Sequence, residues 1–315
     1  MPYDKKKWIA DQKELAETTL KAQVEFLSKG DNLVNSIAEV EFLKDPNDDR
    51  PCWNWTLRNR MLMKNQGSFD SRNSNIWRSL GRFPKDWQKK ITILKPNLMH
   101  LHKVDKGLIK KSGRTFKCRT CNNEFQNLSL GISDGSILTI PKGYMAQTVY
   151  DVSNTYGTKL ENTYEPKKLP VLFGLAEVLE IKVSYLSDPT MQNDSHGFVT
   201  GHDNAMVLQV ENPKTFYHEL AHKIDQKVNL NGKLKGGQDP QQEITAELTA
   251  SVLEKMYEVE NCGKFSFDYI STYAEKQKKT VDQAINQILP RVEKILKWVM
   301  TEAENLNIKN GMIAQ

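Results

Sequence analysis

Two histidines four positions apart constrain the fold of this 315-residue chain more than any other feature. His218 and His222 enclose Glu219 in a His-Glu-Leu-Ala-His segment that has apolar residues on both sides. In an α-helix, residues at i and i+4 project from one face, so the two imidazoles can share one metal ion. The glutamate between them can reach a metal-bound water and take its proton. The segment therefore predicts a helix with a metal-binding face and an apolar back.

A third ligand is expected on a second helix. Glu243 follows His222 by 21 positions, and a helix, a turn and an antiparallel return helix fit this interval. Three protein ligands leave one coordination position for water, which is the pattern of catalytic zinc sites. Glu247 lies one turn further on the same face, where it can accept a hydrogen bond from the free ring N–H of a ligand histidine. The alternative is that both glutamates are ordinary solvated helix residues.

This ligand set implies hydrolysis of a peptide bond. Zinc would polarise the carbonyl and lower the pKa of its water, and Glu219 would act as the base. A protein with this motif can also keep the metal and lose the activity. Residues 196–210 resemble an edge hairpin just before the metal helix, and an extended substrate could pair with it by strand addition. His196 and His202, in this segment, are more typical of loop histidines than of ligands.

Hydrophobic periodicity and helix breakers predict an α+β chain. We expect helices at 4–28, 33–44, 52–65, 169–180, 213–227, 239–258, 266–286 and 290–306, strands at 91–94, 145–152 and 181–186, and irregular structure over 97–143. The expected organisation is an N-terminal helical extension (1–50), a small basic α+β domain (51–157), a linker (158–168) and a mostly helical metal-binding domain (169–315).

The net charge of +5 conceals an uneven distribution. Residues 51–150 carry 18 Lys and Arg against 5 Asp and Glu, whereas the segments before and after them are net acidic. A basic block suggests a polyanionic partner, nucleic acid first, and disfavours a protein that mimics DNA; the alternative is a solvated lysine-rich surface. The lack of a long apolar stretch and of an N-terminal apolar segment predicts a cytoplasmic protein without a membrane partner.

Aromatic residues are interleaved with the cations of the basic block. Base stacking on aromatic rings, with cations along the phosphates, is how single strands are held without strong sequence preference. The alternative is that the tryptophans are core anchors of a small domain. The candidate DNA contacts are Trp53, Trp55, Arg58, Arg60, Lys64, Trp77, Arg78, Arg82, Lys89 and Lys90.

A cysteine pair suggests a second, structural zinc ion. Cys118 and Cys121 form a Cys-x-x-Cys flanked by phenylalanines, and His100 and His102 lie upstream. Together they could form a Cys2His2 site in a zinc-knuckle insertion over 97–143. A single Cys-x-x-Cys is a weak signal, and His-x-His is an uncommon partner spacing.

Four segments resemble, in order, the motifs of the ArdC-type antirestriction proteins of plasmids and phages. They are 55–59 (Trp-Thr-Leu-Arg-Asn) with Gln66, 77–82 (Trp-Arg-Ser-Leu-Gly-Arg) followed by 91–96, 149–157 (Val-Tyr-Asp-Val-Ser-Asn-Thr-Tyr-Gly), and 218–222 with Glu243-x-x-Ala-Glu247. The resemblance covers roughly 50–96 and 145–255.

The resemblance implies an N-terminal single-stranded DNA-binding domain, to whose contacts it adds Asn59, and a C-terminal zincin-like metallopeptidase domain. It implies protection of incoming DNA from restriction endonucleases. A protein substrate associated with DNA or with a restriction system is a further expectation that does not follow from the motif. Two other hypotheses stay open. The protein could be a non-catalytic single-strand binder whose metal domain is structural, or an effector metallopeptidase that reaches an anionic partner through its basic block.

Overall fold

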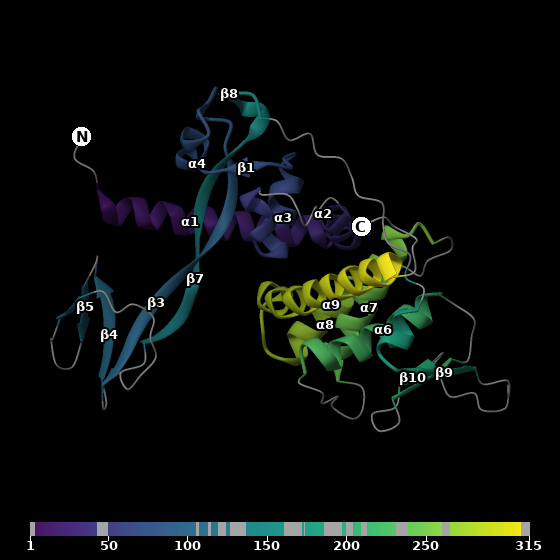
Figure 1. Ribbon diagram of the computed structural model, residues 1–315. Coiled ribbons are helices and arrows are strands. Elements are labelled where there is room, and N and C mark those ends of the chain that lie inside the picture. The colour runs from purple at the N-terminus through teal and green to yellow at the C-terminus, as the bar shows by residue number, and fades with distance from the viewer. Residues whose placement is uncertain are drawn as a thin grey trace. The chain divides into compact units, whose positions relative to one another are not determined.

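The structure is a computed structural model (Figure 1). It describes residues 4–42, 50–104, 107–112, 115–118, 124–126, 137–160, 172, 174–185, 197–199, 204–208, 213–230, 239–259 and 265–309, with the backbone alone for Lys5, Phe42, Tyr185 and those within 98–142. These residues form helices and small sheets, which confirms the predicted α+β class. They divide into two compact units, Met1–Lys21 with Gln88–Val149, and Ala22–Trp87 with Tyr150–Gln315. No helix within the described ranges is long and apolar enough to cross a membrane.

A long antiparallel pair dominates the first unit, where α1 (Lys5–Leu27) also begins. β3 (Ile91–Val104) pairs with β7 (Ile137–Asp151), and β4 (Gly107–Ser112), β5 (Thr115–Cys118) and β6 (Glu124–Gln126) extend the sheet. The strand predicted over 91–94 continues past Pro96 through an irregularity, a place where the missing proline N–H is tolerated. For the described parts of 97–143 the expectation of irregular structure is therefore wrong, because these residues pair as strands although their polar sequence hides the strand period.

The second unit contains a small group of short elements. It comprises η1 (Pro51–Asn54), α3 (Leu57–Asn65), β1 (Ser71–Arg72), α4 (Ser74–Ser79), β2 (Arg82–Pro84), η2 (Val152–Asn154) and β8 (Thr155–Gly157). The predicted helix over 52–65 begins later than expected, because the Thr56 side chain caps α3 by accepting from the Asn59 N–H. β1 pairs with the end of β7, and β2 pairs with β8 in a two-stranded ribbon.

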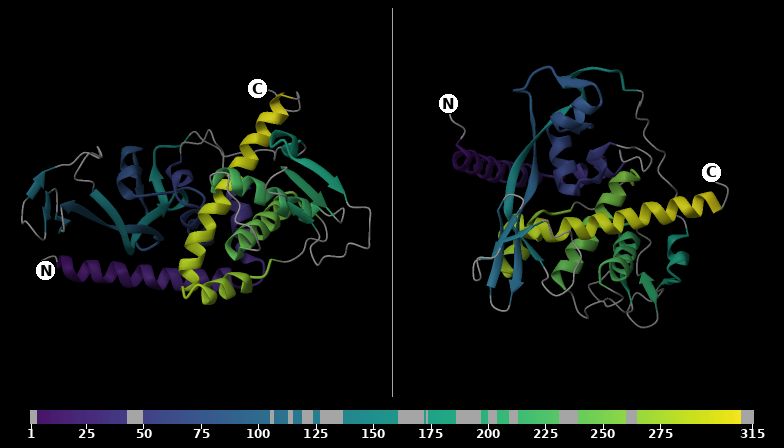
Figure 2. Two further views of the ribbon diagram at one scale, coloured as in Figure 1. Left: turned by 90° about the horizontal axis from the view of Figure 1, so that it is seen from below. Right: turned by 60° about the vertical axis from the view of Figure 1, so that its left-hand side comes forward.

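The helical core of the second unit lies around α7 (Pro240–Met256). The helices α2 (Asn32–Phe42), α6 (Pro213–Val228) and α9 (Val281–Lys309) all pack against α7 (Figures 1 and 2). Beside α6 lies a three-stranded sheet in the order β10 (Gly197–Val199), β11 (Ala205–Leu208), β9 (Lys182–Tyr185). The antiparallel β10–β11 pair confirms the predicted hairpin. Of the helix predicted over 169–180, the described part is α5 (Leu175–Val178).

The C-terminal helices divide at a different place from the prediction. α8 (Asp268–Lys276) ends before Lys278, which adopts a positive φ, and α9 starts at Val281 and continues through Pro290. A capping box sets this start, since Thr280 and Gln283 exchange hydrogen bonds between their side chains and backbone N–H groups. The helix predicted over 266–286 is therefore wrong as one element, and Pro290 does not begin the last helix.

Residues from the N-terminal third contribute to the same core as the metal-binding helices. Leu27, Leu33, Ile37 and Leu57 are buried in one cluster with side chains of α6, α7 and α9. The predicted boundaries at residue 50 and at 158–168 thus do not delimit this core, which extends beyond 169–315. Residues 161–171 of the predicted linker lie outside the described residues.

Candidate metal centre

The helices α6 and α7 supply every side chain of the predicted metal site. α6 carries His218, Glu219 and His222, and α7 carries Glu243 and Glu247. The start of α7 is fixed by Asp239, whose carboxylate accepts hydrogen bonds from two backbone N–H groups, followed by Pro240. Later residues of α6 lie beside earlier residues of α7, so the two helices are antiparallel, as predicted.

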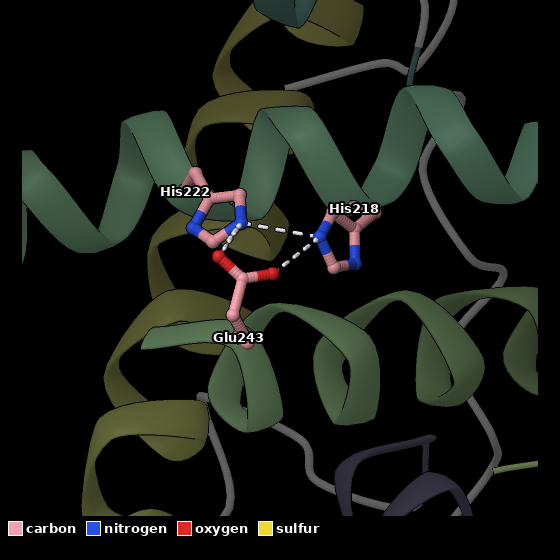
Figure 3. A group of neighbouring side chains, drawn as sticks. All are labelled: His218, His222 and Glu243. Carbon is pink, nitrogen blue, oxygen red and sulfur yellow. Dashed lines mark hydrogen bonds and ion pairs between the residues drawn. The ribbon is translucent and has the colours of Figure 1, made fainter. Parts of the chain in front are cut away.

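Three side chains converge on one point between the two helices (Figure 3). The two Nε2 atoms of His218 and His222 lie 3.1 Å apart. The carboxylate oxygens of Glu243 lie 3.5 Å from Nε2 of His218 and 3.6 Å from Nε2 of His222. Ligand atoms about 2.1 Å from a tetrahedral zinc ion are separated by about 3.4 Å. The triangle therefore has the size that one such ion requires, and the three residues can hold a metal ion.

Glu247 lies on the other side of the His218 ring. Its carboxylate is 3.2 Å from Nδ1 of His218, which leaves Nε2 directed at Glu243 and His222. An acceptor at Nδ1 fixes the tautomer whose Nε2 lone pair is free for a metal. The other oxygen of Glu247 pairs with Nζ of Lys214 at 2.5 Å. Sequence reasoning missed Lys214, although its position one turn before His218 on α6 was a usable signal.

Glu219 is buried between the metal helix and the hairpin. Burial raises the pKa of its carboxyl, and the nearby charges of His218 and His222 oppose this. β10 lies against α6 here, and a Cβ built on Gly197 would approach the Glu219 Cγ to 3.3 Å. Gly197 thus lets the strand pass close to the candidate base, with room for no larger side chain.

The carboxylates around His218 change its protonation in the metal-free protein. Burial lowers the pKa of His218, but hydrogen bonds with Glu243 and Glu247 and the charges of Glu219 and Glu247 outweigh it and raise the pKa to about 9. Hydrogen bonds from the two histidines lower the pKa of Glu243 to about 2. The stabilisation from His218 is therefore complete below its ordinary pKa of 6.5 and is lost as pH rises through about 9.

Metal binding should consequently release a proton. Because Nε2 must be deprotonated to bind a metal, affinity is expected to rise by up to tenfold per pH unit between pH 7 and about 9, where His218 titrates. Calorimetric titration in buffers of different ionisation enthalpy measures the proton count. An affinity that does not change with pH over this interval would contradict the protonated state of His218.

The structure buries four of the predicted DNA contacts. Trp53, Arg58, Arg60 and Trp77 lie in the interior of the second unit. The indole N–H of Trp77 donates to the Tyr150 carbonyl at 2.7 Å. In this structure these four side chains therefore serve the interior and do not form a nucleic-acid surface.

The remaining candidates are more accessible. Trp55, Asn59, Lys64 and Arg82 are half-buried, whereas Arg78, Lys89 and Lys90 are exposed. For the cysteine site, Cys121 lies outside the described residues, and the side chains of His100, His102 and Cys118 are not among those described. That site stays a prediction.

Comparisons with known proteins find similarity to solved structures alone. No family model and no curated protein matches the chain. The solved structures that match the chain include two crystal structures of the antirestriction ArdC protein from the R388 plasmid. These neighbours belong to the family that the sequence motifs resemble. The metal-free ArdC structure gives a TM-score of 0.46 at 11% identity, over 79% of this chain and 84% of ArdC. The Mn(II)-bound ArdC structure gives a TM-score of 0.45 at 12% identity, over 79% of this chain and 85% of ArdC.

Proposed function

We propose that the protein is a zinc-dependent peptidase of antirestriction type that also binds single-stranded DNA. The observation that carries the peptidase proposal is the triangle formed by His218, His222 and Glu243. Its size suits one tetrahedral ion, and three protein ligands leave a position for water or substrate.

The residues around the triangle have the chemistry that hydrolysis needs. A bound zinc ion would polarise the scissile carbonyl and acidify its water. Glu219 would be the base that takes the proton of that water. Its raised pKa brings the carboxyl closer to the pH at which proton transfer in both directions is efficient. Glu247 holds the His218 ring by its Nδ1 atom.

The substrate proposal rests on strand β10. β10 is the terminal strand of its sheet among the described residues, and it lies against the helix that carries Glu219. An edge strand offers unpaired backbone groups to an extended peptide. A peptide that pairs with β10 would run beside the metal site.

A peptide library with quenched fluorescence tests this function on the zinc-loaded protein. The proposal expects cleavage that a chelator abolishes and that added zinc restores. Chelator-insensitive cleavage, or no cleavage of any sequence by protein that holds one zinc ion, would contradict it and favour the non-catalytic hypothesis.

Binding of single-stranded DNA is proposed from the charge of residues 51–150, the exposed cations Arg78, Lys89 and Lys90, and the resemblance of the motifs. The logarithm of the affinity for an oligonucleotide should fall linearly with the logarithm of the salt concentration. The slope should be about −0.7 for each phosphate contacted. Fluorescence anisotropy over a salt series measures this slope. No binding at low salt would contradict the DNA proposal and favour the effector hypothesis.

A further inference from the structure

An aromatic pair lies on the outer face of the ribbon formed by β2 and β8. Phe83 and Tyr156 are directly opposite in the antiparallel register, with ring centroids 6.0 Å apart and tilted by 38°. Their exposed fractions are 43% and 57%. Exposed aromatic rings lack the stabilisation that burial would supply. A pair of them on one surface can therefore mark a binding site.

The opposite face of the same ribbon is buried at one of its two residue pairs. Pro84 and Thr155, the next pair in the register, are buried, as the alternation of side chains along a strand requires. Arg82 donates from Nε to the Thr155 hydroxyl at 2.9 Å and lies over the ring of the buried Trp77. These contacts on the inner face fix the ribbon, and with it the position of the two exposed rings.

Two glycines allow the strands to meet at the end of the ribbon. Gly157 has a φ of +125°, and a Cβ there would collide with the carbonyl oxygen of Gly81. Gly81 also has a positive φ. The Gly-Arg of the 77–82 motif and the Tyr-Gly of the 149–157 motif therefore come together in one structure, which explains why both segments carry glycine.

The exposed charges beside the ribbon in the sequence are cations. Arg78, Lys85 and Lys159 are exposed. Of the nearby acids, Asp70 pairs with Arg72, the Asp151 carboxylate accepts from the Ser153 N–H, and Asp86 is half-buried. An aromatic face with cations around it complements a strand whose bases are apolar and whose backbone is anionic.

We infer that the outer face of the β2–β8 ribbon is the stacking surface for single-stranded nucleic acid. This inference rests on the proposed binding function and gives it a location different from the buried tryptophans. Bases stack on Phe83 and Tyr156, and the phosphates lie along Arg78, Lys85 and Lys159. The rings contact base faces and the cations contact phosphates. Neither contact involves the 2′-hydroxyl that distinguishes RNA from DNA, so the surface accepts both kinds of strand.

The test compares Phe83→Ala/Tyr156→Ala with a matched control, Phe26→Ala/Tyr269→Ala. Phe26 and Tyr269 are 41% and 55% exposed but lie on α1 and α8. Anisotropy titrations use oligo(dT) and oligo(rU) of equal length over a salt series. The ribbon variant should lose at least about tenfold in affinity for both strands with an unchanged salt slope, because stacking involves no counterion release. Lys85→Gln should instead reduce the slope by about 0.7.

Each outcome separates the ribbon from the general binding function. If the parent protein and the ribbon variant bind equally well, the stacking surface is overturned and the binding function stays intact. An equal loss in the control variant overturns the ribbon too, and no binding by the parent protein overturns both. Phe83→Leu/Tyr156→Leu controls for unfolding of the alanine variant, since leucine keeps an apolar cover but has no π face. It should bind as weakly as the alanine variant. Full binding by the leucine variant would overturn the inference.

Discussion

Glu219→Gln is expected to lower the rate of peptide hydrolysis by about 10²–10⁴-fold, the usual contribution of a general base. Glutamine has nearly the same shape but cannot take a proton from the attacking water. The three candidate ligands His218, His222 and Glu243 are unchanged, so the variant should still bind one metal ion. Initial rates on the zinc-loaded variant, with metal content measured on the same sample, check both statements.

The matched control for this change is Glu258→Gln, which replaces an exposed glutamate just beyond α7. It should hydrolyse peptides at the parental rate. A Glu219→Gln variant that keeps its metal and its full rate would show that Glu219 is not the base. If DNA protection also persists in a variant that has lost hydrolysis, peptidase chemistry is not the means of protection.

Arg60→Met is expected to destabilise the second unit by about 3–5 kcal/mol, the cost of breaking a buried ion pair by removing one partner. The Arg60 side chain is fully buried, and its guanidinium pairs with Glu41 at 2.7 Å and Glu293 at 2.6 Å. Methionine fills much of the volume but leaves the buried Glu41 carboxylate without its cation. Urea denaturation followed by circular dichroism measures the change.

Arg78→Met is the control, because Arg78 is exposed in the same region. Its free energy of unfolding should change by less than about 0.5 kcal/mol. If the two variants unfold at the same urea concentration, Arg60 is not a structural residue, and its candidacy as a DNA contact would be restored.

The metal-binding helices could be predicted because their evidence is local. Helical periodicity puts His218 and His222 on one face, and the interval to Glu243 suits a return helix. Asp239 and Pro240 mark the start of that helix by ordinary capping chemistry. Nothing beyond nearest-neighbour geometry was needed for this part of the fold.

Long-range pairing and burial could not be predicted in the same way. The strands predicted at 91–94 and 145–152 are parts of β3 and β7, but the pairing joins residues 35 to 58 positions apart, and nothing local in the sequence specifies it. Arg58 and Arg60 looked like surface cations because their acidic partners Asp282 and Glu293 lie more than 220 positions later. Phe83 and Tyr156 likewise become neighbours only when two distant segments form the ribbon.

The capping box at Thr280 is a different case. Its Thr-x-x-Gln pattern is local and visible in the sequence, but the proline at 290 suggested a later start for the last helix. A proline inside a long helix costs stability, yet the packing of α9 against α6 and α7 keeps the helix continuous.

The metal content of the purified protein tests the central claim most directly. After loading with zinc and desalting, elemental analysis should find one equivalent in the parent and in Glu258→Gln, and none in His218→Ala. A second equivalent that disappears in Cys118→Ser/Cys121→Ser would support the cysteine site as well. If His218→Ala retains the same zinc as the parent protein, the ion is not held by His218, His222 and Glu243, and the peptidase account fails.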